Sequence, residues 1–318
     1  MRIMSWHQVM PEFLDFVFAF GLTEHPKDFH FSGFRSEMEL TDGDNRLRLP
    51  ELGRSGRELR ICYSVKSIER VEASTKSQQN WPWSVRQTST YHALDVETQK
   101  SFWLIVKANK LIRNRSKALC DDQALYQTDE QGESRHGFDS TLRTHQLLCT
   151  LAGENWRWYI NFIEERVQDL TRGTLTESVD QFNDLARVAT SARAQSWATT
   201  AKTWEPPASE KVWTSRFSFE HLQEVHFVEE KANEALLVLN ANASVFRDLQ
   251  DFYSEAVAAL AELPDTITPS TSGFAAFKRS ISIASKDLAM QKSRLEMLLR
   301  LLADRRSLVR THLTLAKL

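Results

Sequence analysis

Glycine, proline and cysteine are all scarce in this sequence. Its 10 Gly and 8 Pro among 318 residues offer few sites for tight turns or phosphate-binding loops, so a glycine-rich nucleotide fold is not expected. The three cysteines, Cys62, Cys120 and Cys149, are odd in number and far apart, which excludes a disulfide framework and a Cys-x-x-Cys zinc signature. We expect reduced thiols in a cytosolic protein whose composition favours long helices.

Net charge and long apolar runs are also nearly absent. The 40 Lys and Arg residues nearly balance the 42 Asp and Glu residues, which gives a net charge of -2. The protein therefore has no overall positive field that would attract nucleic acid, and we do not expect nucleic acid as a partner. The first residues lack the basic segment and sustained apolar run of a secretory signal. The longest apolar stretches, at 16–22 and 102–106, are far shorter than the ~20 residues of a membrane-spanning helix. We therefore expect no membrane span.

Alternating apolar residues predict strands in the first third of the chain, at 59–65, 84–92 and 101–106. The connection at 94–100 is short enough for an antiparallel hairpin. Many phenylalanines between Trp6 and Phe34 predict burial without indicating one type of element. The polar residues at 41–56 predict a surface loop.

Helical periodicity begins after residue 137. A first helix has apolar residues at three- and four-residue steps around Leu142 and Leu148, and Asn155 is placed to cap a second helix that Gly173 would end. A helical pattern continues to about Thr203, and Pro206 and Pro207 then interrupt the chain. This pattern predicts an N-terminal body at 1–212 and a helical region at 213–318.

The helical region predicts two very long helices, at about 218–263 and 274–318. In the second, apolar residues recur every seven positions from Ile281 to Val309, but the intermediate positions include Gln291 and Arg305. That pattern indicates half of a coiled-coil seam. The expected fold class is α+β and helix-rich: an α/β/α-type N-terminal body with a mixed sheet, followed by two very long antiparallel helices.

Charge differs sharply between the two long helices. Residues 219–265 contain ten acids and two bases, whereas residues 278–318 contain ten bases and three acids. Antiparallel packing of the acidic helix on the basic helix is one explanation. Binding of multivalent cations by the acidic helix is another.

Three segments resemble the cytoplasmic portion of filamentous-fungal CorA-like transporter-domain proteins. They are WPWSVRQT at 81–88, GENWRWYINF at 153–162, and residues 217–236, and the resemblance covers about 80–318. It implies an α/β/α cytoplasmic domain, an acidic helical pair and a stalk helix that is basic near the membrane, here at Arg305, Arg306 and Arg310. The two transmembrane helices and the Gly-Met-Asn tripeptide of ion-conducting members are missing from this sequence. We expect either a truncated chain or a relative that retains only the regulatory body.

The resemblance marks eight positions as a family signature: Trp83, Arg86, Gln87, Tyr91, Asn155, Trp156, Trp158 and Tyr159. An arginine flanked by aromatic residues can bind phosphate or carboxylate. The favoured interpretation is structural, with Arg86 paired to a buried acid, the tryptophans in the core, and Trp156 and Tyr159 packed against the sheet.

The acidic helix carries the only metal-site candidates that we identify from the sequence. The carboxylates Glu224, Glu229, Glu230 and Glu234 suit weak binding of Mg²⁺, which needs only one or two carboxylates. His221 and His226 lie among them, but their spacing matches neither the Glu-x-x-His nor the His-Glu-x-x-His arrangement, so a transition-metal site is not expected. No other cofactor is indicated.

No nucleophile elbow, P-loop or Ser-His-Asp order is present, so the sequence gives no support for an enzyme. The leading hypothesis is a non-enzymatic CorA-like regulatory or assembly domain without a pore. It would self-associate or bind a full-length CorA-like transporter, in the cytoplasm or at the inner face of a membrane through that partner. The alternative is a coiled-coil interaction scaffold without ion sensing. A small-molecule enzyme in the N-terminal body is a third possibility, which would require a pocket of titratable groups.

Overall fold

The computed structural model describes residues 2–20, 31–40, 48–71, 81–107, 110–121, 137–176, 219–263 and 269–315. The chain divides into two compact units. Unit 1 comprises Met1–Tyr159 and Leu236–Lys292, and unit 2 comprises Ile160–Ala235 and Ser293–Leu318. Each long helix contributes a segment to both units. The boundary predicted between residues 212 and 213 lies outside the described residues and stays a prediction.

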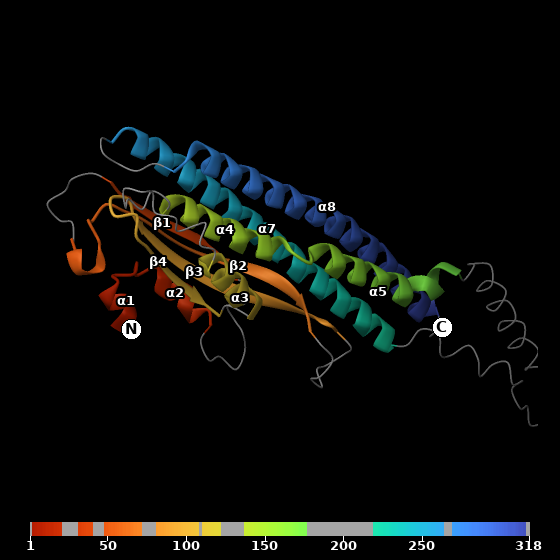
Figure 1. Cartoon of the computed structure of the whole chain (residues 1–318). Helices are drawn as coiled ribbons and strands as arrows, with labels where there is room; N and C mark the ends of the chain where they lie inside the picture. Colours follow the sequence, from red (N-terminus) through yellow and green to blue (C-terminus); the bar gives the residue numbers. More distant parts are fainter. Residues whose placement is uncertain are drawn as a thin grey trace, which may run out of the picture. The chain divides into compact units, whose positions relative to one another are not determined.

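Unit 1 is built on a four-stranded sheet in the order β1-β2-β3-β4 (Figure 1). The strands are β1 (Phe34–Glu39), β2 (Glu58–Arg70), β3 (Trp83–Asp95) and β4 (Ser101–Val106). The three predicted strands are confirmed, and β1 was not predicted. The expectation of a mixed sheet is corrected, because each strand pairs with the strand that precedes it in sequence and every pair is antiparallel.

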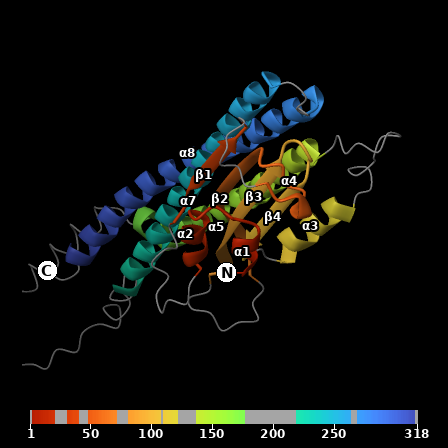
Figure 2. The same ribbon diagram turned by 90° about the vertical axis from the view of Figure 1, so that its left-hand side faces the viewer.

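Helices cover both faces of the sheet (Figures 1 and 2). On one face, α2 (Phe13–Phe18) and the preceding Met10 pack on Cys62 of β2 and Tyr91 of β3. Because side chains alternate along a strand, the neighbouring Tyr63 points to the other face, where α4 (Gly137–Gly153) packs on β2. The remaining short elements are α1 (Arg2–Trp6), the 3₁₀ turn η1 (Pro50–Leu52), and α3 (Lys110–Asp121), which packs on α4.

The long helices confirm the sequence prediction. Helix α7 spans Phe219–Ala261 and α8 spans Thr271–Leu315. The predicted seam of α8 is buried at each described position of the seven-residue series: Ile281, Leu288, Leu295 and Leu302. Helix α5 (Trp156–Thr176) contradicts the predicted stop at Gly173, since it continues through that residue. A glycine inside a helix costs only about 1 kcal/mol relative to alanine, so it need not end one.

The turn between β3 and β4 positions the start of α4. Gln99 in this turn is buried, its Nε2 donates to the carbonyl of Val96 at 2.9 Å, and its Oε1 accepts the backbone N–H of Phe138 at 3.0 Å. A Cβ on Gly137 would lie 2.2 Å from the carbonyl oxygen of Gln99. Glycine is therefore required where the helix begins.

Two asparagine side chains satisfy an edge of the sheet that β1 leaves unpaired. The register of β1 begins at Phe34 opposite Tyr63, so β2 continues beyond its neighbour. Asn242 of α7 then accepts the backbone N–H of Lys66 at 3.0 Å and donates to its carbonyl at 2.7 Å. Asn155 donates to the carbonyl of Ile68 at 3.1 Å. These amides take the place of an adjacent strand and hold α7 and the α4–α5 link on the sheet.

Replacing Asn242 should therefore be strongly destabilising. We expect Asn242→Leu to lower the free energy of unfolding by about 2–6 kcal/mol, because it leaves two buried backbone groups of Lys66 without partners. Urea unfolding followed by circular dichroism measures the change. Asn240→Leu, at an exposed position of the same helix, is the matched control and should change stability by less than about 1 kcal/mol. Equal effects of the two substitutions would contradict the structural role of Asn242.

Candidate functional site

The four carboxylates proposed as Mg²⁺ ligands lie on the segment of α7 that belongs to unit 2. Helical geometry places Glu224 and Glu229 about 140° apart around the helix axis, whereas Glu230 and Glu234 share one face. Within the described parts of the chain, no three His, Cys, Asp or Glu side chains come together as a metal site. The four candidates therefore do not converge, and weak binding of Mg²⁺ stays a prediction.

Three of these carboxylates instead form ion pairs. Glu224 pairs with Arg166 of α5, the Oε2 of Glu229 lies 2.6 Å from Nη1 of Arg306 in α8, and Glu234 pairs with Lys231 at 2.8 Å. His226 Nδ1 lies 3.6 Å from the same oxygen of Glu229. Glu230 is exposed, and the described residues include no ion pair with it. Acidic α7 is thus linked to cations from two other helices.

A further pair completes the charged bundle of unit 2. Nη2 of Arg294 in α8 contacts Asn161 Oδ1 at 2.8 Å and Glu164 Oε2 at 3.2 Å, both on α5. The paired side chains retain solvent exposure, for example 19% for Glu229 and 34% for Arg306. Each such pair contributes at most about 1 kcal/mol, and ions in solution can reach it. Of the other bases at the predicted stalk end, Arg305 is half-buried and Arg310 is exposed.

Aromatic signature residues gather where β3 meets the start of α5. The ring of Tyr159 lies 5.7 Å from that of Trp83, 6.0 Å from that of Trp81 and 6.1 Å from that of Trp156. Trp156 and Tyr159 are almost completely buried, and the indole N–H of Trp156 donates to the carbonyl of Ala152. These contacts serve packing in unit 1.

The remaining signature residues are dispersed. The expected pairing of Arg86 with a buried acid is corrected, because Arg86 is exposed and its partner Glu69, at 3.3 Å, is itself 26% exposed. Gln87 donates to the hydroxyl of Ser64 at 3.3 Å, and Tyr91 lies in the core against α2. Trp158 is 58% exposed, with the guanidinium of Arg157 5.3 Å from its ring centroid. The signature therefore does not form one binding site.

Sequence reasoning missed a buried hydrogen-bond network between the sheet, α4 and α7. His145 of α4 bridges two tyrosines, since its Nδ1 lies 2.8 Å from the hydroxyl of Tyr63 and its Nε2 lies 2.8 Å from the hydroxyl of Tyr253. The Tyr253 hydroxyl is also 3.4 Å from Nδ1 of His92. All four side chains are fully buried. The members of this network are far apart in the sequence, so no local motif predicts their contacts. The sequence shows only that histidines and tyrosines occur among apolar residues.

Burial keeps every member of this network neutral. It lowers the pKa of His92 to about 3, and together with the neighbouring His92 it holds the pKa of His145 well below its usual value. Burial also raises the pKa values of Tyr63 and Tyr253. A neutral imidazole has one donor and one acceptor nitrogen, so one tyrosine donates to His145 while the other accepts from it.

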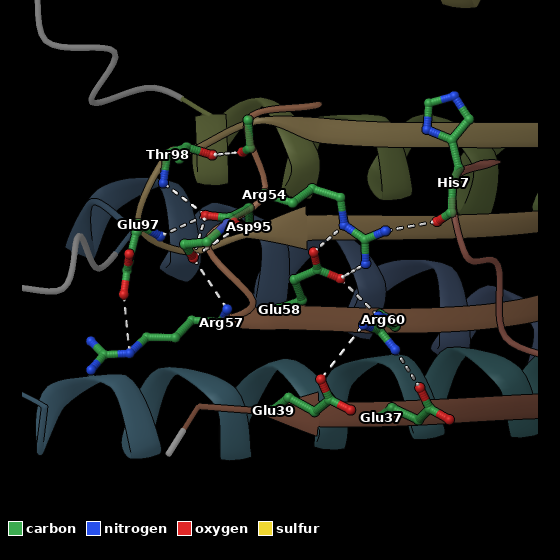
Figure 3. A network of polar contacts seen from close by, with 12 residues as sticks. His7, Glu37, Glu39, Arg54, Arg57, Glu58, Arg60, Asp95, Glu97 and Thr98 are labelled. Carbon is green, nitrogen blue, oxygen red and sulfur yellow. Dashed lines mark hydrogen bonds and ion pairs between the residues drawn. The ribbon is translucent and has the colours of Figure 1, made fainter. Parts of the chain in front are cut away.

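A second polar network lies on the opposite face of the sheet (Figure 3). Glu58 is 1% exposed and is held between Arg54 and Arg60, and Arg60 reaches across to Glu37 at 3.2 Å and Glu39 at 3.5 Å. Burial alone would raise the pKa of Glu58, but the hydrogen bonds and charges of the two arginines bring it below its usual value. The arginine and glutamate side chains satisfy one another and fix β1 on β2.

Asp95 extends this network at the end of β3. Its carboxylate accepts the backbone N–H groups of Glu97 at 3.1 Å and Thr98 at 2.8 Å, together with the hydroxyl of Ser55 (Figure 3). It therefore closes the β3–β4 turn. Eight residues after Glu58 on the same face of β2, Lys66 is 1% exposed, donates from Nζ to the carbonyl of Phe31 at 2.7 Å, and has a pKa lowered to about 8 by burial.

The neutral histidines predict a loss of stability on acidification. An unfolded chain protonates each histidine near its ordinary pKa of 6.5, while the folded chain does not, so stability is complete above pH 6.5 and falls below it. Between pH 7.5 and pH 5.5 each histidine should cost about 1.4 kcal/mol of stability in total, and the slope approaches about 1.4 kcal/mol per pH unit only well below pH 6.5. Urea unfolding between about pH 7.5 and pH 5.5 measures this loss of stability. Most carboxylates are still ionised in that range, so they contribute little to the change.

His145→Gln should reduce the histidine part of this slope by about half, because one of the two buried imidazoles is removed. Asn240→Gln, at an exposed position of α7, changes no titratable group and is the control that should leave the slope unchanged. Identical slopes for wild type and His145→Gln would contradict the assignment of His145 as neutral.

The comparison with family models agrees with the resemblance over residues 80–175, while the resembling segment at 217–236 lies outside the match and stays a prediction. The family model of CorA-like transporters matches residues 1–175, more than half of the chain, while α7 and α8 lie outside the match. No curated protein matches significantly. Among the described helices, none is both long enough and apolar enough to cross a bilayer. By the match to its first 175 residues, which include the sheet, α4 and most of α5, this chain belongs to the family of CorA-like transporters.

Proposed function

We propose that this chain is a non-enzymatic assembly module of the CorA-like family, in which the charged bundle of unit 2 responds to divalent cations. In this role it acts as a cytoplasmic regulatory domain. It associates with itself or with a full-length CorA-like transporter, and that partner brings it to the inner face of a membrane.

The observation that carries this proposal is the pairing of acidic α7 with arginines of α5 and α8. Glu224 faces Arg166 and Glu229 faces Arg306. Both contacts are partly exposed, so solvent ions can compete for the carboxylates. A bundle held by such contacts is more responsive to ions than one held by apolar packing alone.

Glu229 contacts residues of both α7 and α8. It contacts Arg306 through Oε2, has His226 3.6 Å away, and its backbone carbonyl accepts the side-chain amide of Asn233. Mg²⁺ retains several waters and needs only one or two carboxylates, so it can bind at Glu229 without a closed cage. Such binding replaces the link to Arg306 and alters the α7–α8 contact.

The alternative function is an interaction scaffold without ion sensing. The divergence of the four carboxylates around α7 favours it, because a selective cation site usually requires converging ligands. In a pure scaffold, salt weakens the ion pairs by screening, and Mg²⁺ has no effect beyond ionic strength.

The buried histidine network does not support the enzyme hypothesis. Tyr63, His92, His145 and Tyr253 are each 0% exposed, so a substrate cannot touch their polar atoms in this conformation. A pocket of about 280 Å³ lies between α4 and the start of α8, but its Asp139 already accepts the backbone N–H of Ser270. The described residues lining the pocket include no histidine, cysteine or lysine, and the tyrosine–histidine pairs of the network are closed to a substrate.

Thermal unfolding in about 10 mM MgCl₂, compared with NaCl of equal ionic strength, tests the proposal. Binding of Mg²⁺ to the folded bundle should raise the midpoint by about 2–4 °C. Light scattering on the same samples reports whether the assembly state changes.

Matched variants assign the response to one carboxylate. Glu229→Gln should remove most of the gain specific to Mg²⁺, whereas Glu230→Gln, at the exposed neighbouring position, should retain it. If NaCl reproduces the whole effect, the scaffold function is correct. If both variants keep the full gain, Glu229 is not the site.

A further inference from the structure

The solvent-facing side of α8 has an apolar stripe that the buried seam does not use. Ile283, Met290, Met297 and Leu301 are 54%, 55%, 65% and 39% exposed. We call these four residues the exposed stripe. Large apolar side chains with this exposure are unusual when they recur in register on one helix.

The spacing places the four side chains in line. Ile283, Met290 and Met297 are separated by seven residues, and Leu301 lies 18 residues after Ile283, which is five helical turns. All four fall within an arc of about 40° around the helix axis. The buried seam, which includes Leu288 and Leu295, lies on the far side of α8. The helix therefore has two apolar faces, and the described residues bury only one of them.

Three basic side chains lie within or beside the exposed stripe. Arg279, Lys286 and Arg300 are exposed, and in the described part of the chain none of them forms an ion pair. Two acids, Asp287 and Asp304, are also exposed beside the stripe. The three exposed bases against these two acids leave a small positive charge around the stripe.

We propose that this face of α8 binds an acidic amphipathic helix of a partner protein. The inference rests on the assembly function proposed above and names the partner surface and its chemistry. Seven-residue spacing is the repeat that a second helix follows when it packs in a coiled coil. The two methionines adapt to the side chains of the incoming helix, and acidic residues on its flank pair with Arg279, Lys286 and Arg300.

Charge argues against a second copy of α8 as the occupant, since two such helices would bring their basic flanks together. The α7 helix of a second copy lacks matching anchors, because Leu237 is the one large apolar side chain that the described part of α7 exposes. A membrane surface is also a poor match. Helices that lie on lipid have a broad apolar face, whereas this stripe is narrow.

Fluorescence anisotropy with designed peptides tests the proposal on the full chain. The probe is a labelled helical peptide of about four heptads, with leucine at the core positions and glutamate at the flanking positions. A second peptide has lysine at the flanks, and a third has the acidic composition in shuffled order. Only the acidic heptad peptide should bind, and binding should weaken as salt is raised.

Variants on α8 identify the surface. The double variant Met290→Ser and Met297→Ser should weaken binding at least tenfold, while Leu237→Ser on α7 should change it less than twofold. Reversing Arg279, Lys286 and Arg300 to glutamate should switch the preference to the lysine-flanked peptide. Circular dichroism and the unfolding midpoint confirm that each variant is folded.

Equal binding of the heptad and shuffled peptides would overturn this proposal. An unchanged affinity in the variant with both methionines replaced would overturn it as well. Self-association that depends on Met290 and Met297 would assign the stripe to a second copy, and binding to vesicles of anionic lipid without peptide binding would assign it to a membrane. The proposed cation response is measured separately at Glu229, so either proposal can fail while the other holds.

Discussion

The contact between Asn242 and the backbone of Lys66 is the constraint on which the arrangement of unit 1 depends. Strand β2 extends past β1, and a strand edge under a helix must find partners for its N–H and C=O groups. One amide side chain satisfies both groups of Lys66, and Asn155 satisfies the next carbonyl on that edge. Apolar packing alone lets a helix slide along a sheet, whereas these hydrogen bonds fix α7 at one position. The register of the other α7 side chains in unit 1 follows from that position.

The network of His145 depends on this register. Its two tyrosine partners come from β2 and α7, and both distances are 2.8 Å, so a shift of one helical residue would break a bond in a fully buried place. Buried polar groups of this kind specify one packing among many apolar alternatives. The specificity has a cost, because the imidazoles must remain neutral and acidification then favours unfolding.

Sequence patterns predicted the elements better than the contacts between them. Alternation at 59–65 and periodicity at 218–263 identified β2 and α7, since most of their buried residues are apolar. Strand β1 has charged and polar residues at most of its positions, so it gave no such signal. Helical periodicity places Asn242, unlike exposed Asn240, on the apolar face of α7, but its hydrogen bonds to the sheet edge have no signal in the sequence. The divergence of Glu224 and Glu229 was predictable from helical geometry, but their arginine partners on α5 and α8 were not.

The charge asymmetry of the long helices has two separable parts. In unit 2, acids of α7 and α5 are matched by Arg166, Arg294 and Arg306, which accounts for part of the opposite charge of the helices by pairing within the chain. The exposed bases Arg279, Lys286 and Arg300 are not matched in that way by described residues. If intrachain packing were the whole reason for a basic α8, its charges would concentrate on the packed side. They also occur beside an exposed apolar stripe, and that combination is typical of a surface that a further helix covers.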